Sequence, residues 1–154
     1  MRAVALFAWE VMAIIKEKKF KISSVIENLA PSGLTDGDTE RTEITPDGFL
    51  KISDGEIVIM YTESTEGGKV VSDIVITEST VSVIRRGAVI SDMVFSEGET
   101  HKSLYQVPPY SFDAEIYTKK IRNNMTRDGG RLDIFYTMKI GGAEKSVRMK
   151  IETV

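Results

Sequence analysis

From Phe20 onward, apolar and polar residues alternate along most of the chain. The alternation is clearest over 110–116, 132–140 and 147–151, where every second residue is apolar. Successive side chains of a β-strand point to opposite faces, so this period predicts strands with one apolar face and one solvated face. We predict strands over 20–27, 40–45, 49–53, 56–63, 70–77, 80–86, 88–95, 100–107, 110–118, 121–126, 131–140 and 144–152.

Turn-forming residues separate these stretches, and they include the pairs Asp47-Gly48, Asp54-Gly55, Gly67-Gly68, Gly129-Gly130 and Gly141-Gly142. Such turns join antiparallel strands, whereas parallel strands need crossover connections of about a dozen residues or more, which the sequence does not offer. We therefore predict an all-β fold made of a single antiparallel meander. Closing the meander into a β-barrel would leave no exposed sheet edge, and we favour it over the alternative, a β-sandwich.

Residues 1–19 differ in pattern from the rest of the chain. Glu10 interrupts their apolar run, Lys16, Lys18 and Lys19 follow it, and there is no small-residue cleavage site. These features argue against a secretory signal and against a membrane span. We expect a short N-terminal helix or a disordered extension over 1–19, and one barrel domain over 20–154. Translation from Met12 is an alternative, which would place residues 1–11 outside the natural protein.

The composition is that of an ordinary soluble domain. The chain has 154 residues, of which 42% are hydrophobic and 28% charged, and this balance suits one core without disorder. It has no cysteine, which excludes disulfides, thiolate nucleophiles and cysteine-bound metals. We expect a cytoplasmic monomer or homodimer without a transmembrane segment.

Candidate catalytic and metal-binding residues are few. His101 is the only histidine, which together with the lack of cysteine excludes zinc sites built on histidine pairs. No Gly-x-Ser-x-Gly or Ser-x-x-Lys motif offers an activated serine. Asp113 and Glu115 lie two apart on one predicted strand, but on its polar face, where solvated carboxylates are common. We therefore predict no catalytic residue, no metal site and no cofactor.

Charges are unevenly distributed, although the net charge is only -3. Acids outnumber bases over 27–115, whereas bases outnumber acids over 1–26 and 116–154. The first and last strands of a closed meander are neighbours, so the basic ends should form one basic face that includes Lys119, Lys120 and Arg122. Such a face could bind nucleic acid or an anionic surface, with Tyr117 and Phe135 as aromatic partners. A solvated face paired with neighbouring acids is the simpler interpretation, and nucleic acid is therefore not the expected partner.

A series of short blocks from residue 20 to 152 carries a family pattern. The matching residues are Lys21-Ile22-Ser23-Ser24, Asp47-Gly48, Ile57, Tyr61, Glu63, Val83-Ile84-Arg85-Arg86-Gly87, Ser91, Met93, Phe95, Gly98, Tyr105, Pro108, Thr118, Gly129-Gly130 and Tyr136. By these blocks, and most specifically by the Arg-Arg-Gly and Ser-x-Met-x-Phe blocks, the chain resembles the YwiB-like family of uncharacterised bacterial proteins. The resemblance implies a calycin-like, lipocalin-type barrel and no established activity.

One corner departs from the family pattern. Family members show Tyr-x-Thr-Pro-Tyr-Gly where this chain has Tyr105-Gln106-Val107-Pro108-Pro109-Tyr110-Ser111. The loop at this corner therefore need not follow the family's geometry. The segment before about Lys16 has no counterpart in the pattern, which favours the start at Met12.

The adjacent residues Arg85 and Arg86 are the polar pair of most interest. Neighbouring strand residues point to opposite faces, so one arginine should point inward or along the barrel rim. An inward arginine needs an acidic partner, backbone carbonyls or an anionic ligand.

Barrels of this type commonly hold one small ligand in their mouths. Methionine adapts in shape and tyrosine brings a hydroxyl, which suits a small apolar or anionic amphipathic molecule. We therefore predict a non-enzymatic barrel that binds such a molecule; the alternatives are a lumen packed shut by large side chains, a basic-face binding module, and a structural or protein-interaction barrel. The candidate ligand-binding residues are Arg85, Arg86, Tyr61, Met93, Phe95, Tyr105 and Tyr136.

Overall fold

The computed structural model describes residues 13–29 and 35–154, and their regular structure is entirely β. This part of the chain contains no helix with the length and apolarity needed to cross a membrane. The strands are β1 (Ile14–Leu29), β2 (Thr35–Ile44), β3 (Asp47–Ser53), β4 (Glu56–Thr65), β5 (Gly68–Ile76), β6 (Val81–Gly87), β7 (Ile90–Phe95), β8 (Thr100–Val107), β9 (Tyr110–Thr126), β10 (Gly129–Ile140) and β11 (Ala143–Thr153).

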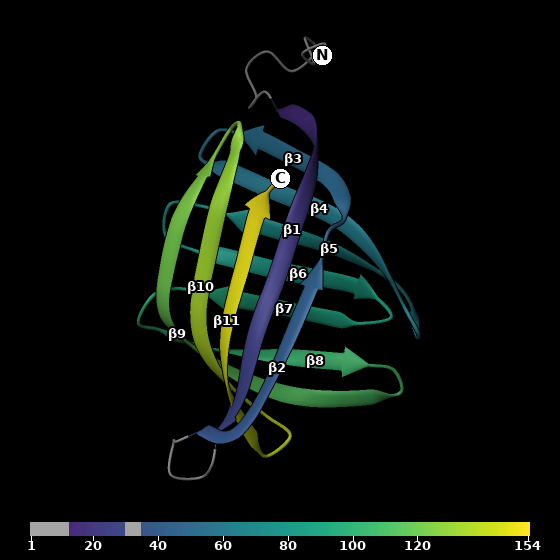
Figure 1. Ribbon diagram of the computed structural model, residues 1–154, viewed down its shortest axis with the longest axis vertical. Helices are drawn as coiled ribbons and strands as arrows, with labels where there is room; N and C mark the ends of the chain where they lie inside the picture. Colours follow the sequence, from purple (N-terminus) through teal and green to yellow (C-terminus); the bar gives the residue numbers. More distant parts are fainter. Residues whose placement is uncertain (1–12, 30–34) are drawn as a thin grey trace.

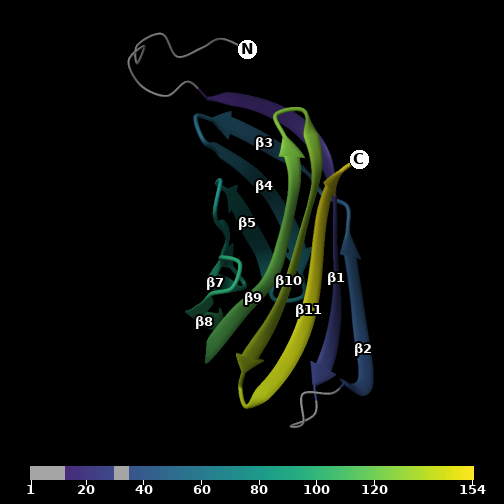
Figure 2. The ribbon, with the colours of Figure 1, turned by 90° about the vertical axis from the view of Figure 1, so that its left-hand side faces the viewer.

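The strands form one antiparallel sheet that closes on itself. Each strand from β3 to β11 pairs with the next, β3 pairs with β1, and β11 returns to pair with β1. Figure 1 shows β9, β10, β11 and β1 side by side on one wall, with β3 to β8 crossing behind them. In Figure 2 these two walls face each other. The predicted closed barrel is confirmed, whereas the calycin-like assignment within that class stays a prediction.

The strand that closes the barrel, β1, begins earlier than predicted. Its first part, Ile14 to Lys19, pairs with β3, and its second part pairs with β11 on one side and β2 on the other. The expected helix or extension over 1–19 is therefore wrong for these first strand residues, whose partner strand could not be read from the sequence. Residues 1–12, with the alternative start at Met12, lie outside the described residues.

In β9 the structure has one strand where two were predicted, over 110–118 and 121–126. Phe135 of β10 lies opposite Lys120, but the next residue, Tyr136, lies opposite Thr118, so Lys119 is the additional residue of a β-bulge. The bulge breaks the alternation of apolar and polar residues without ending the strand. This is why the pattern resembled a turn.

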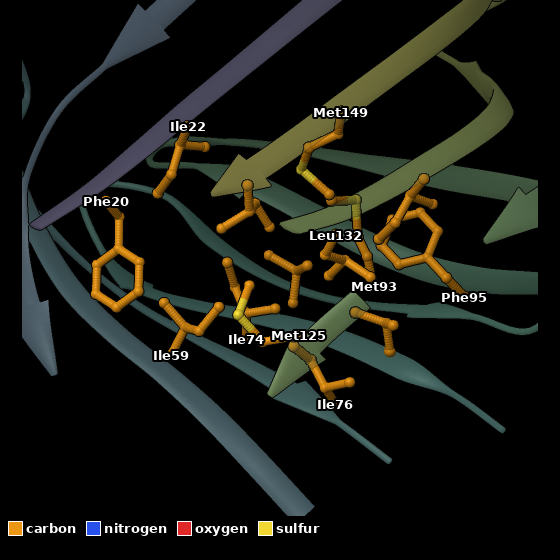
Figure 3. Packing of buried hydrophobic residues seen from close by; sticks show 14 of the residues in the cluster. Phe20, Ile22, Ile59, Ile74, Ile76, Met93, Phe95, Met125, Leu132 and Met149 are labelled. Atoms are coloured by element: carbon orange, nitrogen blue, oxygen red, sulfur yellow. The ribbon is translucent and has the colours of Figure 1, made fainter. Parts of the chain in front are cut away.

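The core fills the space between the two walls. Figure 3 shows Ile59 of β4 and Ile74 of β5 facing Leu132 and Met149 from the other wall, and Phe20 of β1 belongs to the same core cluster. A Cβ on Gly48 of β3 would lie 3.2 Å from the Phe20 ring and would collide with the Met60 carbonyl oxygen. Glycine at this strand position therefore lets the Phe20 ring pack against the backbone.

Candidate functional site

A cavity of about 370 Å³ lies beside the packed core, between the two walls of the barrel. Met93, Tyr136, Val147 and Met149 line it and also belong to the core cluster. The remaining lining residues are less buried, so the cavity opens toward solvent at this end of the barrel. They are Ser24, Ile26, Glu40, Thr42, Arg85, Tyr105, Met138, Ile140 and Lys145.

Arg85 is the inward-facing member of the arginine pair. Its side chain lines the cavity, and its Nε is buried without a hydrogen-bond partner. Within the described residues it forms no ion pair. Arg86 points to the outer face, where its Nη2 donates to Asp73 Oδ2 at 3.0 Å. The cavity therefore contains a guanidinium whose charge has no acidic partner from the described chain.

Arg85 belongs to a row of polar side chains that crosses β5 to β8. Ser72 lies opposite Arg85, Arg85 lies opposite Ser91, and Ser91 lies opposite Tyr105. Directly opposite residues of antiparallel strands share a face, so these side chains all point inward. We call Ser72, Arg85, Ser91 and Tyr105 the polar row.

The two serines of the polar row are buried and unsatisfied. Ser72 is 0% exposed and Ser91 is 4% exposed. Neither Oγ has a hydrogen-bond partner among the described residues. Buried polar atoms in folded proteins are nearly always hydrogen-bonded, so unpaired hydroxyls on both sides of a guanidinium indicate a place for a polar partner.

Tyr136 faces the polar row from β10. Burial raises the pKa of its hydroxyl from 10.0 to about 12; the positive charge of Arg85 acts in the opposite direction, and Tyr105 raises the pKa further. The Tyr136 ring also packs on Phe95, with 4.7 Å between the ring centroids. The hydroxyl therefore stays protonated at neutral pH and can donate a hydrogen bond to an anion.

The other charged groups of the cavity lie near its opening. Lys145 is half-buried and Glu40 is exposed, and both line the cavity. Their charges are opposite, so together they add no net charge. The positive charge of Arg85 then remains, and the cavity favours an anion.

The structure separates the predicted ligand-binding residues into three groups. Arg85, Met93, Tyr105 and Tyr136 line the cavity together. Tyr61 and Phe95 are buried in the core without lining it, and Arg86 lies on the outer surface.

Several lining residues were missed by the sequence analysis, since cavity membership depends on how the strands pair. A signal was present for two residues of the polar row that flank Arg85 without lining the cavity, Ser72 and Ser91. Ser72 alternates with the buried residues Val70 and Ile74, and Ser91 precedes Met93 and Phe95 on the same face. A serine on an otherwise apolar strand face therefore points to the site.

The predicted basic face lies outside the cavity. No group of three or more histidine, cysteine, aspartate or glutamate residues that could hold a metal occurs in the described residues. Pairing of β1 with β11 brings the two basic ends of the chain together, as expected. Lys119, Lys120 and Arg122 are exposed on β9.

Comparison with known proteins agrees with this fold. The chain is 27% identical over 124 residues to the uncharacterized β-barrel protein YwiB of Bacillus subtilis (strain 168), covering 80% of this chain and 82% of that protein. It is also similar to the crystal structure of YwiB from Bacillus subtilis, with a TM-score of 0.72 and 23% identity over 91% of this chain and 95% of that chain. The family model described as "Domain of unknown function (DUF1934)" matches residues 31–152. The chain therefore belongs to the DUF1934 family, whose YwiB-like members are bacterial barrel proteins of unknown function.

Proposed function

We propose that this barrel binds one small anionic amphipathic molecule in the Arg85 cavity. The observation that carries the proposal is the buried Nε of Arg85, which has no partner in the described residues. The Arg85 side chain is half-buried, and a buried donor such as its Nε costs free energy when it is left without a hydrogen-bond partner. An anion in the cavity would supply the missing partner.

The polar row suits a carboxylate head group. A guanidinium binds a carboxylate through two parallel hydrogen bonds, and charge-assisted bonds of this kind are the strong ones. The hydroxyl of Tyr136, which lines the cavity, provides a further donor for the remaining lone pairs. Because one uncompensated cation faces the cavity, a monoanion matches its charge.

The apolar lining suits a short hydrocarbon chain. Ile26, Met138, Ile140 and Val147 line the cavity around the polar row. A volume of about 370 Å³ lies within the range of small-ligand sites. Methionine side chains adapt to ligands of irregular shape, which supports an amphipathic molecule.

Binding without chemical turnover fits the lining better than catalysis does. The hydroxyls of Ser72 and Ser91 have no base as a partner among the described residues. A serine nucleophile needs such a base to become reactive. The protonated hydroxyl of Tyr136, in contrast, can donate a hydrogen bond to a bound head group without any activation.

Isothermal titration calorimetry with octanoate and 1-octanol tests this proposal. The two probes share a chain length and differ in charge. We expect saturable binding of octanoate, and a loss of at least about tenfold in affinity for Arg85→Gln, because a charge-assisted hydrogen bond disappears. Arg86→Gln is the matched control, since this neighbour lies on the outer face, and it should bind like the wild type.

The outcome for 1-octanol decides whether charge matters. We expect 1-octanol to bind the wild type more weakly than octanoate does. Its affinity for Arg85→Gln should equal its affinity for the wild type. Absence of saturable octanoate binding to the wild type would refute the proposal. Equal affinity of both probes for the wild type would refute the role of Arg85 as an anion anchor.

A further inference from the structure

The outer surface of the strands that close the barrel carries a row of five residues, three of which are cations. Strand register places one residue of each strand on this line, in the order Arg41 (β2), Val25 (β1), Arg148 (β11), Phe135 (β10) and Lys120 (β9). Neighbouring strands lie about 4.8 Å apart, so the line is about 19 Å long. We call it the basic row, which Lys119 and Arg122 flank.

The β-bulge in β9 adds a lysine to this surface. Thr118 is buried and Ile121 is half-buried, so both side chains face inward. The residues between them, Lys119 and Lys120, are both exposed. In a regular strand one of two adjacent residues would point inward, and the bulge removes this constraint. Two adjacent lysines therefore project from the outer wall.

Phe135 holds two arginines of this surface in place. The guanidinium carbon of Arg148 lies 5.0 Å from the ring centroid, and that of Arg122 lies 5.8 Å from it. Cation–π contacts at these distances orient the guanidinium groups over the ring. Their N–H edges remain available for bidentate hydrogen bonds to phosphate.

The cations of the basic row and its flanks form no ion pair with any described residue. Within the described residues, Arg41, Lys119, Lys120, Arg122 and Arg148 form no ion pair, whereas cations farther along the same strands do. Lys21 pairs with Glu43, Lys150 with Glu152, and Arg131 with Asp133. A hollow of about 280 Å³ is lined by Arg41, Lys119, Phe135 and Arg148, and also by Glu27.

We propose that the basic row binds single-stranded nucleic acid without sequence preference. The row is linear, which suits a chain of phosphates, and its length corresponds to a few nucleotides. Aromatic rings among cations provide surfaces on which bases stack. Phe135 lies on the row, and Tyr117, 42% exposed on the same strand as the two lysines, provides a second ring.

The apolar residues of the basic row favour this partner over a lipid surface. The apolar members of the row, Val25 and Phe135, are only half-exposed, so they do not project as membrane-inserting groups would.

The sequence did not favour nucleic acid as a partner, because neighbouring acids were expected to neutralise the basic face. None of the cations of the basic row forms an ion pair within the part of the chain that the structure describes, which answers that objection.

Fluorescence anisotropy with a labelled thymidine oligonucleotide of about 12 nucleotides tests the proposal. We expect binding at low salt that weakens steeply as salt increases. The double variant Lys119→Gln and Lys120→Gln should lose about tenfold or more in affinity, and its salt slope should fall by about one to two. The double variant Lys69→Gln and Lys102→Gln, which changes the net charge equally on β5 and β8, is the matched control and should bind like the wild type.

Phe135→Leu tests the ring separately from the charges. Leucine retains apolar volume, so the fold should survive, which a thermal melt would check. We expect about a fivefold to tenfold weaker affinity with an unchanged salt slope, because stacking is lost and phosphate contacts remain.

Three outcomes would overturn the proposal. They are absence of oligonucleotide binding at low salt, equal weakening by the two double lysine variants, and equal affinity for a duplex of the same length. Tighter binding to vesicles containing phosphatidylglycerol than to the oligonucleotide would instead assign the basic row to a lipid surface. Octanoate binding should not change in the lysine variants, because these side chains face away from the cavity.

Discussion

At the scale of single residues, Arg85 and Arg86 show what alternation can and cannot predict. The sequence predicted that one arginine faces inward, and the structure confirms it for Arg85. The sequence could not show which arginine faces inward. Val83 shares a strand face with Arg85 and Ile84 shares the other face with Arg86, so both faces carry an apolar residue next to the arginine. Ser72 and Ser91 became site residues only when strand pairing placed them on either side of Arg85.

Tyr136 predicts a pH dependence of stability. Its folded-state pKa is raised from 10.0 to about 12, chiefly by burial. Above pH 10 the unfolded chain releases this proton while the folded protein keeps it, so the free energy of unfolding should fall as pH rises from about 10 to about 12, by about 2 to 3 kcal/mol. Tyr136→Phe should remove this part of the dependence. Urea denaturation of both proteins across this pH range measures it, and identical pH profiles would contradict the account.

At the scale of strands, the period-two pattern predicted most elements within a few residues. It failed at β1 and β9 for different physical reasons. The first part of β1 has its partner in β3, a pairing that no local pattern reveals. In β9 the bulge at Lys119 shifts the alternation by one residue, which the pattern presents as a break.

The early start of β1 predicts the effect of shortening the chain. A chain that begins at Phe20 loses the residues that pair with Asp47 to Ile52 of β3, and also the Lys16–Asp128 ion pair at 2.8 Å. Its free energy of unfolding should fall by about 2 kcal/mol or more, because several ladder hydrogen bonds disappear. A chain that begins at Met12 keeps this pairing and is the reference for the comparison. Urea denaturation measures both, and equal stability of the two shortened chains would contradict the pairing.

At the scale of the whole molecule, the sequence predicted that the sheet closes into a barrel. This closure explains both the basic row on the outer wall and the cavity inside. Pairing of β1 with β11 joins the basic ends of the chain on the outer wall. The same pairing encloses the cavity, which both walls line. The cavity itself could not be predicted, because the many large inward residues equally allowed a filled lumen. Whether they fill it depends on the register of all the strands at once.

The most direct test of a ligand site inside the barrel is nuclear magnetic resonance of methionine methyl groups during an octanoate titration. Met93, Met138 and Met149 line the cavity, whereas Met60 and Met125 do not. We predict saturable shifts of the first three methyl signals at one common affinity, with Met60 and Met125 nearly unchanged, and a loss of these shifts in Arg85→Gln. Shifts confined to Met60 or Met125, or no saturable shift at any methionine, would contradict the account.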